Sequence, residues 1–205
     1  MALTKLWAGA VQNDASGTGV TTASLDSTGY THIVAFFKYE GAASTMTLSD
    51  NKSSSDPTNL TLESHTNGDL NGQLSWMPIA SGGTLALDVQ STNEGISTTN
   101  VDAGSLATTT ATASFMGVGE YDLNTYTPGT GWTEDYDSGP YGQSRTDASG
   151  TLDPVCTWVA TQAWVACAAS FKEAAAATGT INYDVTTQSV WYYTSNASAN
   201  WTVNL

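Results

Sequence analysis

The most regular feature of the sequence is a series of short segments in which apolar and polar residues alternate. These segments are rich in β-branched and aromatic residues, and clusters of Gly, Asn, Asp and Ser separate them. A period of two over a short segment is typical of a β-strand with one buried face. We therefore predict an all-β protein, with strands at residues 31–40, 44–50, 72–80, 84–90 and 156–171.

Other segments depart from strict alternation. Residues 112–121 (TASFMGVGEY) run apolar and small together, which predicts a central strand without a polar face. Residues 91–104 and 124–131 are expected to be loops, the second because Pro128 and Gly129 form a turn signal. Residues 171–179 (FKEAAAATG) are the one convincing helix former, and we expect them to mark the exit from the main domain.

This pattern divides the chain into three parts. Residues 1–30 form an N-terminal arm with the first strands, and residues 31–172 form an antiparallel β-sandwich of the jelly-roll or immunoglobulin-like type. Residues 173–205 form a linker and a small C-terminal β appendage, which is too short to bury a core of its own. The appendage must dock on the sandwich or on another subunit, and we expect the contact to bury three aromatic side chains, Trp191, Tyr193 and Trp201.

The charge of the chain restricts its partners. Lys and Arg total 5 against 19 Asp and Glu, for a net charge of −14. Nucleic-acid binding depends on cations that neutralise phosphates, so this role is excluded, and an anionic membrane would repel the chain for the same reason. The first residues lack the apolar h-region of a secretory signal, which predicts synthesis in the cytoplasm without export by that route.

The two cysteines flank an expected hairpin. A turn at Thr161 and Gln162 would place Cys156 opposite Cys167, at a separation close to that of a disulfide. The alternative is two small buried thiols in a core strand, which a reducing cytosol favours.

Catalytic patterns are sparse. The only histidines are His32, within a strand, and His65, in a polar loop, and no G-x-S-x-G elbow accompanies them. The cysteine and histidine spacings do not match a zinc site. We therefore expect no enzyme activity and no obligatory cofactor.

The richest cluster of carboxylates lies at residues 132–137 (WTEDYD). Strand alternation would place Asp135 and Asp137 on one face, where they could hold Ca²⁺ if a loop added carbonyl oxygens. Glu134 and Asp137 could serve as the carboxylate pair of a glycosidase. The simplest interpretation is a solvated edge strand.

Aromatic residues offer a second candidate site. Trp132, Tyr136 and Tyr141 lie in a Gly-rich region, and exposed rings there could stack on sugars. Trp76, Trp158 and Trp164 lie within expected strands and are assigned to core packing.

Several of these segments resemble a known module. The strand IVAFFKYEG, the SDN turn at residues 49–51, the strand SWMPIASGGTLALDV, the GTGWTE element at 129–134 and the pattern of residues 158–172 are similar to a β-sandwich module of bacteriophage structural proteins and bacterial surface proteins. The C-terminal residues 181–205 resemble terminal segments of marine phage virion and appendage proteins. The resemblance implies an architectural role and transfers no catalytic residue.

These observations predict a structural component of a phage virion, either a capsid decoration protein or a subunit of a fibre or tail appendage. Its partners would be copies of itself and other virion proteins, held together by the terminal strands. The alternative is a carbohydrate-binding adhesin module that contacts host surface glycans.

Overall fold

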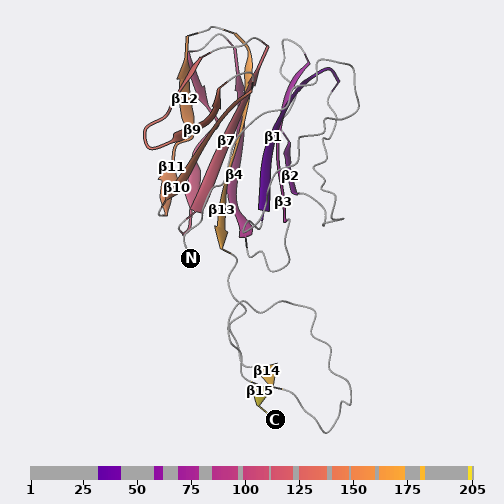
Figure 1. The fold of residues 1–205 in the computed structure, drawn as a ribbon, viewed down its shortest axis with the longest axis vertical. Helices are drawn as coiled ribbons and strands as arrows, with labels where there is room; N and C mark the ends of the chain where they lie inside the picture. Colours follow the sequence, from indigo (N-terminus) through magenta and orange to yellow (C-terminus); the bar gives the residue numbers. More distant parts are fainter. Residues whose placement is uncertain are drawn as a thin grey trace.

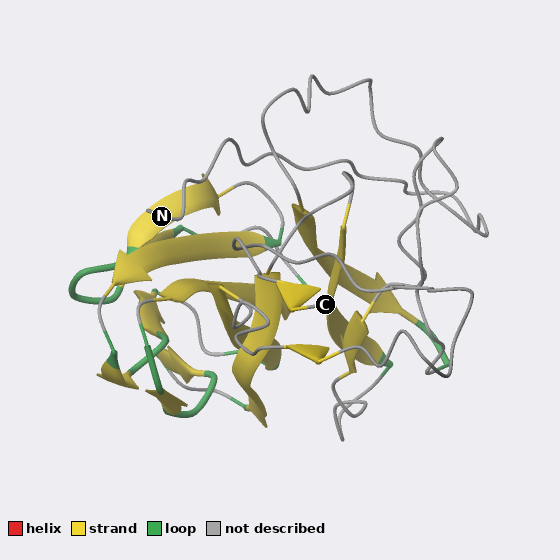
Figure 2. Ribbon diagram, turned by 90° about the horizontal axis from the view of Figure 1, so that it is seen from below, coloured by secondary structure: helices red, strands yellow, loops and turns green. Residues whose placement is uncertain are grey.

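The protein is described here by a computed structural model, which covers residues 32–42, 58–61, 69–78, 85–96, 99–110, 112–121, 125–137, 140–147, 149–159, 162–173, 181–182 and 203–204. These residues form strands and loops without a helix (Figure 1, Figure 2), so the predicted all-β class is confirmed. Accordingly, this part of the chain contains no helix that is long and apolar enough to cross a membrane.

Among the described residues, thirteen strands make up the main body. They are β1 (His32–Glu40), β2 (Thr58–Thr61), β3 (Leu70–Pro78), β4 (Leu85–Gly95), β5 (Asn100–Asp102), β6 (Leu106–Thr108), β7 (Thr112–Glu120), β8 (Tyr126–Pro128), β9 (Thr133–Asp137), β10 (Tyr141–Asp147), β11 (Gly150–Leu152), β12 (Val155–Trp158) and β13 (Trp164–Glu173). Two further strands, β14 (Ile181–Asn182) and β15 (Val203–Asn204), pair with each other in parallel.

The strands of the main body form antiparallel sheets arranged in layers. The central sheet has five strands in the order β4-β13-β7-β10-β9, and a three-stranded sheet β1-β3-β2 packs on one of its faces. The sheets β5-β12-β8 and β11-β6 cover the other face. In Figure 1 these two groups lie on opposite sides of the central strands. The arrangement is consistent with a β-sandwich, with two cores that share one central sheet.

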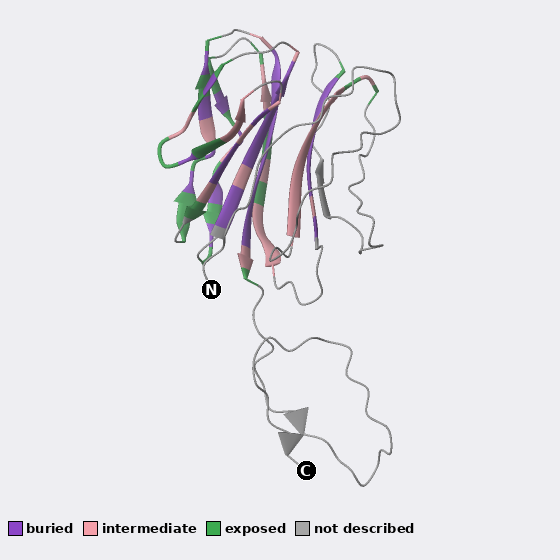
Figure 3. Ribbon diagram, in the orientation of Figure 1, coloured by how far each residue is buried: buried purple, intermediate pink, exposed green. Residues whose placement is uncertain are grey.

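Strand β13 shows why the central sheet is buried on both faces. Alternate side chains of a strand point to opposite faces, and both sets here are apolar. Trp164 and Ala166 belong to the core under β5, β8 and β12. Val165 and Phe171 belong to the core under β1 and β3. Figure 3 shows β13 buried along most of its length, as expected for a strand that reads as a continuous apolar run.

The outer sheet packs closely on β7 through an aromatic side chain. Phe36 of β1 lies directly over Gly117, where a Cβ atom would come within 2.2 Å of the Phe36 ring. Trp76 of β3 meets Phe171 of β13 edge to face, with ring centroids 5.5 Å apart. The predicted packing roles of Trp76, Trp158 and Trp164 are therefore confirmed.

Several sequence-based boundaries are wrong. The expected loop at 91–104 contains the end of β4 and all of β5, and the expected loop at 124–131 contains β8. The helix expected from residue 171 does not begin there, because β13 continues to Glu173. The central strand at 112–121 is confirmed, since β7 is the middle strand of the five. The strand at 44–50, the arm at 1–30, and Trp191, Tyr193 and Trp201 lie outside the described residues.

The predicted cysteine hairpin is also wrong. Cys156 in β12 pairs with Val101 and Pro128, whereas Cys167 in β13 pairs with Thr92 and Gly117. The two strands belong to different layers, and both thiols are free and buried. The short connection between them crosses from one sheet to the next, because each apolar strand is paired on both sides within its own sheet.

Candidate functional site

The residues proposed for sugar binding do not form a surface platform. Trp132 is 6% exposed and Tyr141 is 1% exposed, and both belong to the core under the central sheet. The indole Nε1 of Trp132 donates to the Asp153 carbonyl oxygen at 3.1 Å, and the Tyr141 hydroxyl donates to Gln143 Oε1 at 3.2 Å. Of the three predicted rings only Tyr136, on edge strand β9, stays half-buried.

Strand β9 carries the predicted calcium ligands at a bulge. The register with β10 pairs Gln143 with Glu134 and Gly142 with Tyr136, so Asp135 is the extra residue. Asp135 accepts a hydrogen bond from Ser144 at 3.0 Å, on the β10 side of the bulge. The bulge interrupts the alternation on which the shared face of Asp135 and Asp137 was predicted.

Asp137 points toward β8 instead. Its Oδ2 accepts from the Tyr126 backbone N–H at 3.4 Å, and its Oδ1 is buried without a hydrogen-bond partner. In the part of the chain that the structure describes, no three His, Cys, Asp or Glu side chains are grouped closely enough to hold a metal ion. Calcium binding at β9 therefore remains a prediction without structural support.

A buried polar cluster surrounds Tyr126. Its hydroxyl donates to Glu120 Oε2 at 2.5 Å, and Glu120 is only 3% exposed. The Tyr126 ring stacks on Trp158 and on Tyr141, with centroids 5.3 Å and 4.5 Å apart. These contacts attach β8 and β12 to the end of β7 in the central sheet.

A buried glutamine connects the same two layers. Gln143 of β10 donates through Nε2 to the Val155 carbonyl oxygen at 3.0 Å, and its Oε1 accepts from the Gly129 N–H at 3.3 Å. Its 1% exposure means that these bonds are made away from water, where an unmade bond is costly. Gln143 is therefore a structural link between β10 and the covering sheet.

Burial and nearby carboxylates disfavour the charged forms in this cluster. Desolvation, assisted by the hydrogen bond to Glu120, raises the pKa of Tyr126 far above its usual value. Desolvation also raises the pKa of Cys156, with a further contribution from Glu120 and Asp137. In the other core, burial raises the pKa of Cys167 to about 12. These thiols stay protonated near neutral pH and do not supply a thiolate nucleophile.

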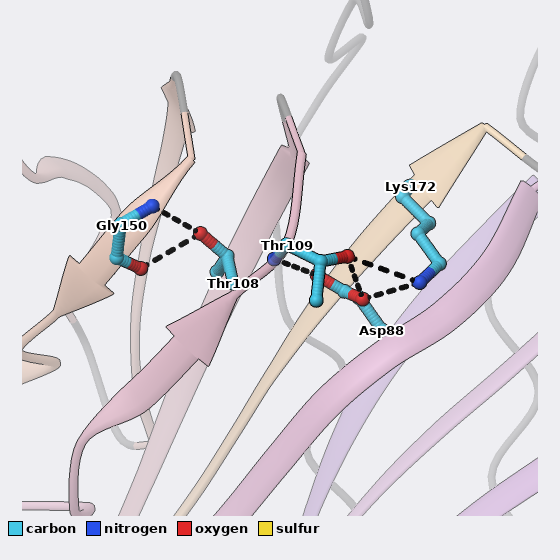
Figure 4. Close-up of polar contacts among 5 residues, drawn as sticks. All are labelled: Asp88, Thr108, Thr109, Gly150 and Lys172. Carbon is cyan, nitrogen blue, oxygen red and sulfur yellow. Dashed lines mark hydrogen bonds and ion pairs between the residues drawn. The ribbon is translucent and has the colours of Figure 1, made fainter.

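A second network fixes a bulge in β4 (Figure 4). The register with β13 passes from Val89 to Leu87, so Asp88 is the extra residue, and its side chain is 1% exposed. Asp88 Oδ1 lies 2.6 Å from Lys172 Nζ, and Asp88 Oδ2 accepts from the Thr109 backbone N–H at 2.8 Å. Burial alone would raise the pKa of Asp88, but the bonds from Lys172 and Thr109 hold it below its usual value.

The network continues into the neighbouring two-stranded sheet. Thr108 Oγ1 donates to the Gly150 carbonyl oxygen at 2.8 Å and accepts from the Gly150 N–H at 2.9 Å (Figure 4). Asp88, Thr109 and Lys172 therefore join β4 and β13 to the segment that follows β6. All of these groups act on one another within the protein, which is the pattern of a structural network.

Sequence patterns did not single out Glu120, Tyr126, Gln143 or Asp88. The roles of Glu120, Tyr126 and Gln143 come from side-chain hydrogen bonds between different sheets. Such contacts do not alter the alternation of apolar and polar residues, so the sequence pattern does not reveal them. Asp88 offers a weak signal, since it is the one charged residue within the segment LALDVQ.

Comparison with models of protein families, with curated proteins and with solved structures gave no match.

Proposed function

We propose that the chain is a structural, non-enzymatic subunit that assembles with copies of itself and with other proteins of a particle. The resemblance of its sandwich segments and C-terminal residues to bacteriophage virion proteins implies that the particle is a phage virion. A capsid decoration protein and a fibre or tail appendage subunit both fit this role.

The observation that carries the proposal is the double coverage of the central sheet. Strand β13 buries side chains in both cores. The covering sheet β5-β12-β8 is also attached to the central sheet by buried polar bonds, from Tyr126 to Glu120 of β7 and from Gln143 of β10 to Val155. A sheet packed on both faces resists deformation, since close-packed interiors transmit strain rather than absorb it. Rigidity of this kind suits a subunit that is displayed on a particle.

The arrangement of the chemistry-bearing side chains supports the same conclusion. The buried carboxylates of Glu120 and Asp88 bond to Tyr126 and Lys172 within the fold. The two thiols are buried and protonated. An enzyme would need some of these groups directed toward a substrate.

The carbohydrate-binding alternative has lost most of its predicted site. Trp132 and Tyr141 are core residues, which leaves Tyr136 as the one partly accessible ring of the three. We therefore propose particle assembly in preference to sugar binding.

The test is the mass of the purified chain by light scattering, with and without residues 178–205. We expect the full chain to form an oligomer and the truncated chain to be a folded monomer with an unchanged β-type circular dichroism spectrum. Equal masses, together with equal loading of both forms onto purified particles, would contradict the proposed role of the C-terminal residues in assembly.

A further inference from the structure

We propose that residues 43–57, which join β1 to β2, cross the outer face of the sheet β1-β3-β2 and bury a polar stripe on β3. The outer face is the one directed away from the central sheet, and the stripe consists of Asn71, Gln73 and Ser75. The inference does not depend on the proposed function. It assigns this face to a segment of the same chain, and so removes it from the surfaces open to a partner.

The stripe is buried although no described strand lies over it. Leu70 and Leu74 of β3 pack in the core shared with the central sheet, so the alternate side chains point to the outer face. These are Asn71, Gln73 and Ser75, and each is 0% exposed. Among the described strands, those packed extensively against this sheet from outside it are β7 and β13, on its inner face. A cover on the outer face is therefore required.

The topology of the sheet identifies the cover. Strands β1 and β2 flank β3 and both run antiparallel to it, so they are parallel to each other and need a crossover connection. Glu40 at the end of β1 pairs with Leu70. Thr58 at the start of β2 pairs with Trp76, toward the other end of β3. The connection must therefore return along the sheet for about 20 Å and pass sideways across β3 for about 10 Å.

The inner face of the sheet is closed to this connection. A Cβ atom on Gly117 would come within 2.2 Å of the Phe36 ring, and one on Gly72 would lie 2.9 Å from Val165 Cγ2. Sheets in such direct contact leave no room for a chain between them. A path beyond the free edge of β2 would leave the stripe exposed, which its complete burial excludes. The crossover therefore runs over the outer face.

The length and apolar residues of the segment suit this path. Residues 43–57 span up to about 50 Å when extended, which exceeds the distance to be crossed. The alternation predicted for residues 44–50 places Met46 and Leu48 on one side. The outer face of β1 offers Ile33, Ala35 and Phe37, which are half-buried (Figure 3). Apolar side chains of the two surfaces can therefore pack together.

The polar groups of the segment suit the stripe. Gln73 donates through Nε2 to Ser75 Oγ at 2.9 Å, and both residues also take part in further interactions. Buried polar side chains require hydrogen-bond partners, and a segment rich in Ser and Thr supplies them from its side chains and its backbone. A purely apolar cover would leave the stripe unsatisfied at high cost.

The first experiment uses the full chain with p-benzoylphenylalanine in place of Phe37. Photolysis should join this residue to a site within 43–57, identified by mass spectrometry of the digested chain. Equal amounts of isotopically labelled and unlabelled chain are mixed beforehand, and each crosslinked peptide should carry one isotope, because the segment belongs to the same chain. The matched control places the probe at Phe115, which packs against Phe171 between the sheets and should not reach the segment.

The second experiment measures thiol labelling of the full-length variant Ser75→Cys. Cys156 and Cys167 are buried, so their background labelling is slow. We expect the new thiol to react about a hundredfold more slowly in the native chain than in urea. Adding Leu48→Asp places a charge against the apolar face and should raise the native rate about tenfold. Thr47→Asp is the matched control, since it adds the same charge on the opposite side and should leave the rate unchanged.

Several results would overturn the inference. A crosslink from position 37 to another segment, such as residues 1–31, would assign the cover to that segment, and peptides with mixed isotopes would assign it to a second copy of the chain. Equal labelling rates with and without Leu48→Asp would show that residues 43–57 do not protect the stripe. A native rate equal to the rate in urea would show that the face is open. The masses measured by light scattering test the proposed function separately.

Discussion

At the scale of single residues, Tyr126 has the surroundings with the clearest energetic consequence. Its ring stacks between Trp158 and Tyr141, and its hydroxyl donates to the buried Glu120 carboxylate. A phenolate at this position would be desolvated and repelled by that carboxylate. Tyr141, which is 1% exposed, has a pKa raised mainly by the same desolvation.

These two tyrosines predict alkaline instability. A phenol whose pKa is higher in the folded state contributes stability that is complete below the unfolded pKa of about 10 and is lost as the pH rises above it. The two tyrosines should lower the free energy of unfolding by about 2.7 kcal/mol per pH unit above pH 10, and the buried thiols of Cys156 and Cys167, whose pKa values are also raised, should add a fall of similar size. Urea unfolding at several pH values from 9 to 11.5 measures this slope.

The matched variants are Tyr126→Phe and Tyr141→Phe. Each removes one titrating phenol, so each should reduce the slope above pH 10 by about 1.4 kcal/mol per pH unit, although Tyr126→Phe also loses a hydrogen bond and lowers the stability at neutral pH. A slope that is the same in the wild type and in both variants would show that neither tyrosine governs the alkaline transition.

Residue type alone misleads at Trp132. A Trp in a Gly-rich segment beside carboxylates suggests an exposed sugar-binding ring, but the turn at Gly129 to Trp132 folds this one inward. The backbone N–H of Trp132 donates to the Gly129 carbonyl oxygen at 3.0 Å, and Gly131 adopts a positive φ of 81°. The turn could be predicted from the glycines, whereas the face to which the indole points depends on the sheet beneath it.

At the scale of the elements, the contact between β1 and β7 depends on a residue without a side chain. Gly117 leaves space for the Phe36 ring, and an added Cβ would lie 2.2 Å from it. We expect Gly117→Ala to destabilise the fold by about 2–3 kcal/mol through overpacking. The midpoint of urea unfolding measures this change.

Gly142 of β10 provides the control for the same substitution in the same sheet. The nearest heavy atom to its added Cβ is 4.0 Å away, at Asp135. Gly142→Ala should therefore change the stability by less than about 0.5 kcal/mol, because the added methyl group meets no close contact. Equal losses in the two variants would mean that the close approach of Phe36 does not determine the cost.

Bulges limit what a period of two can predict within an element. Leu85, Leu87 and Val89 share one face in a regular strand, yet the extra residue Asp88 sends Val89 to the opposite core. The alternation correctly predicted that β4 exists. It could not predict the bulge, because both faces of the central sheet accept apolar residues and neither register is penalised by the sequence pattern.

At the scale of the whole molecule, the all-β class and the central position of β7 could be predicted from the sequence, and the layer order could not. Strands β12 and β13 are joined by a short connection that resembles a hairpin in the sequence, but they lie in different sheets. Whether two consecutive apolar strands pair or separate depends on which other strands are available. That choice involves partners such as β5 and β7, which are distant in the chain.

The acidity of the chain is also a property of the whole molecule. A net charge of −14 destabilises a compact state through self-repulsion, and the screening length falls from about 30 Å at 0.01 M salt to about 10 Å at 0.1 M. Several described carboxylates, such as Asp102, Glu134 and Asp153, are exposed and subject to this screening. The pair of Asp88 with Lys172 is screened less, because the Asp88 side chain is only 1% exposed. We therefore expect the thermal unfolding midpoint to rise as NaCl increases from 0.01 to 0.3 M. Sucrose at matched osmolality is the control for exclusion effects, and a midpoint that is constant or falls with NaCl would mean that attractive surface pairs outweigh the net repulsion.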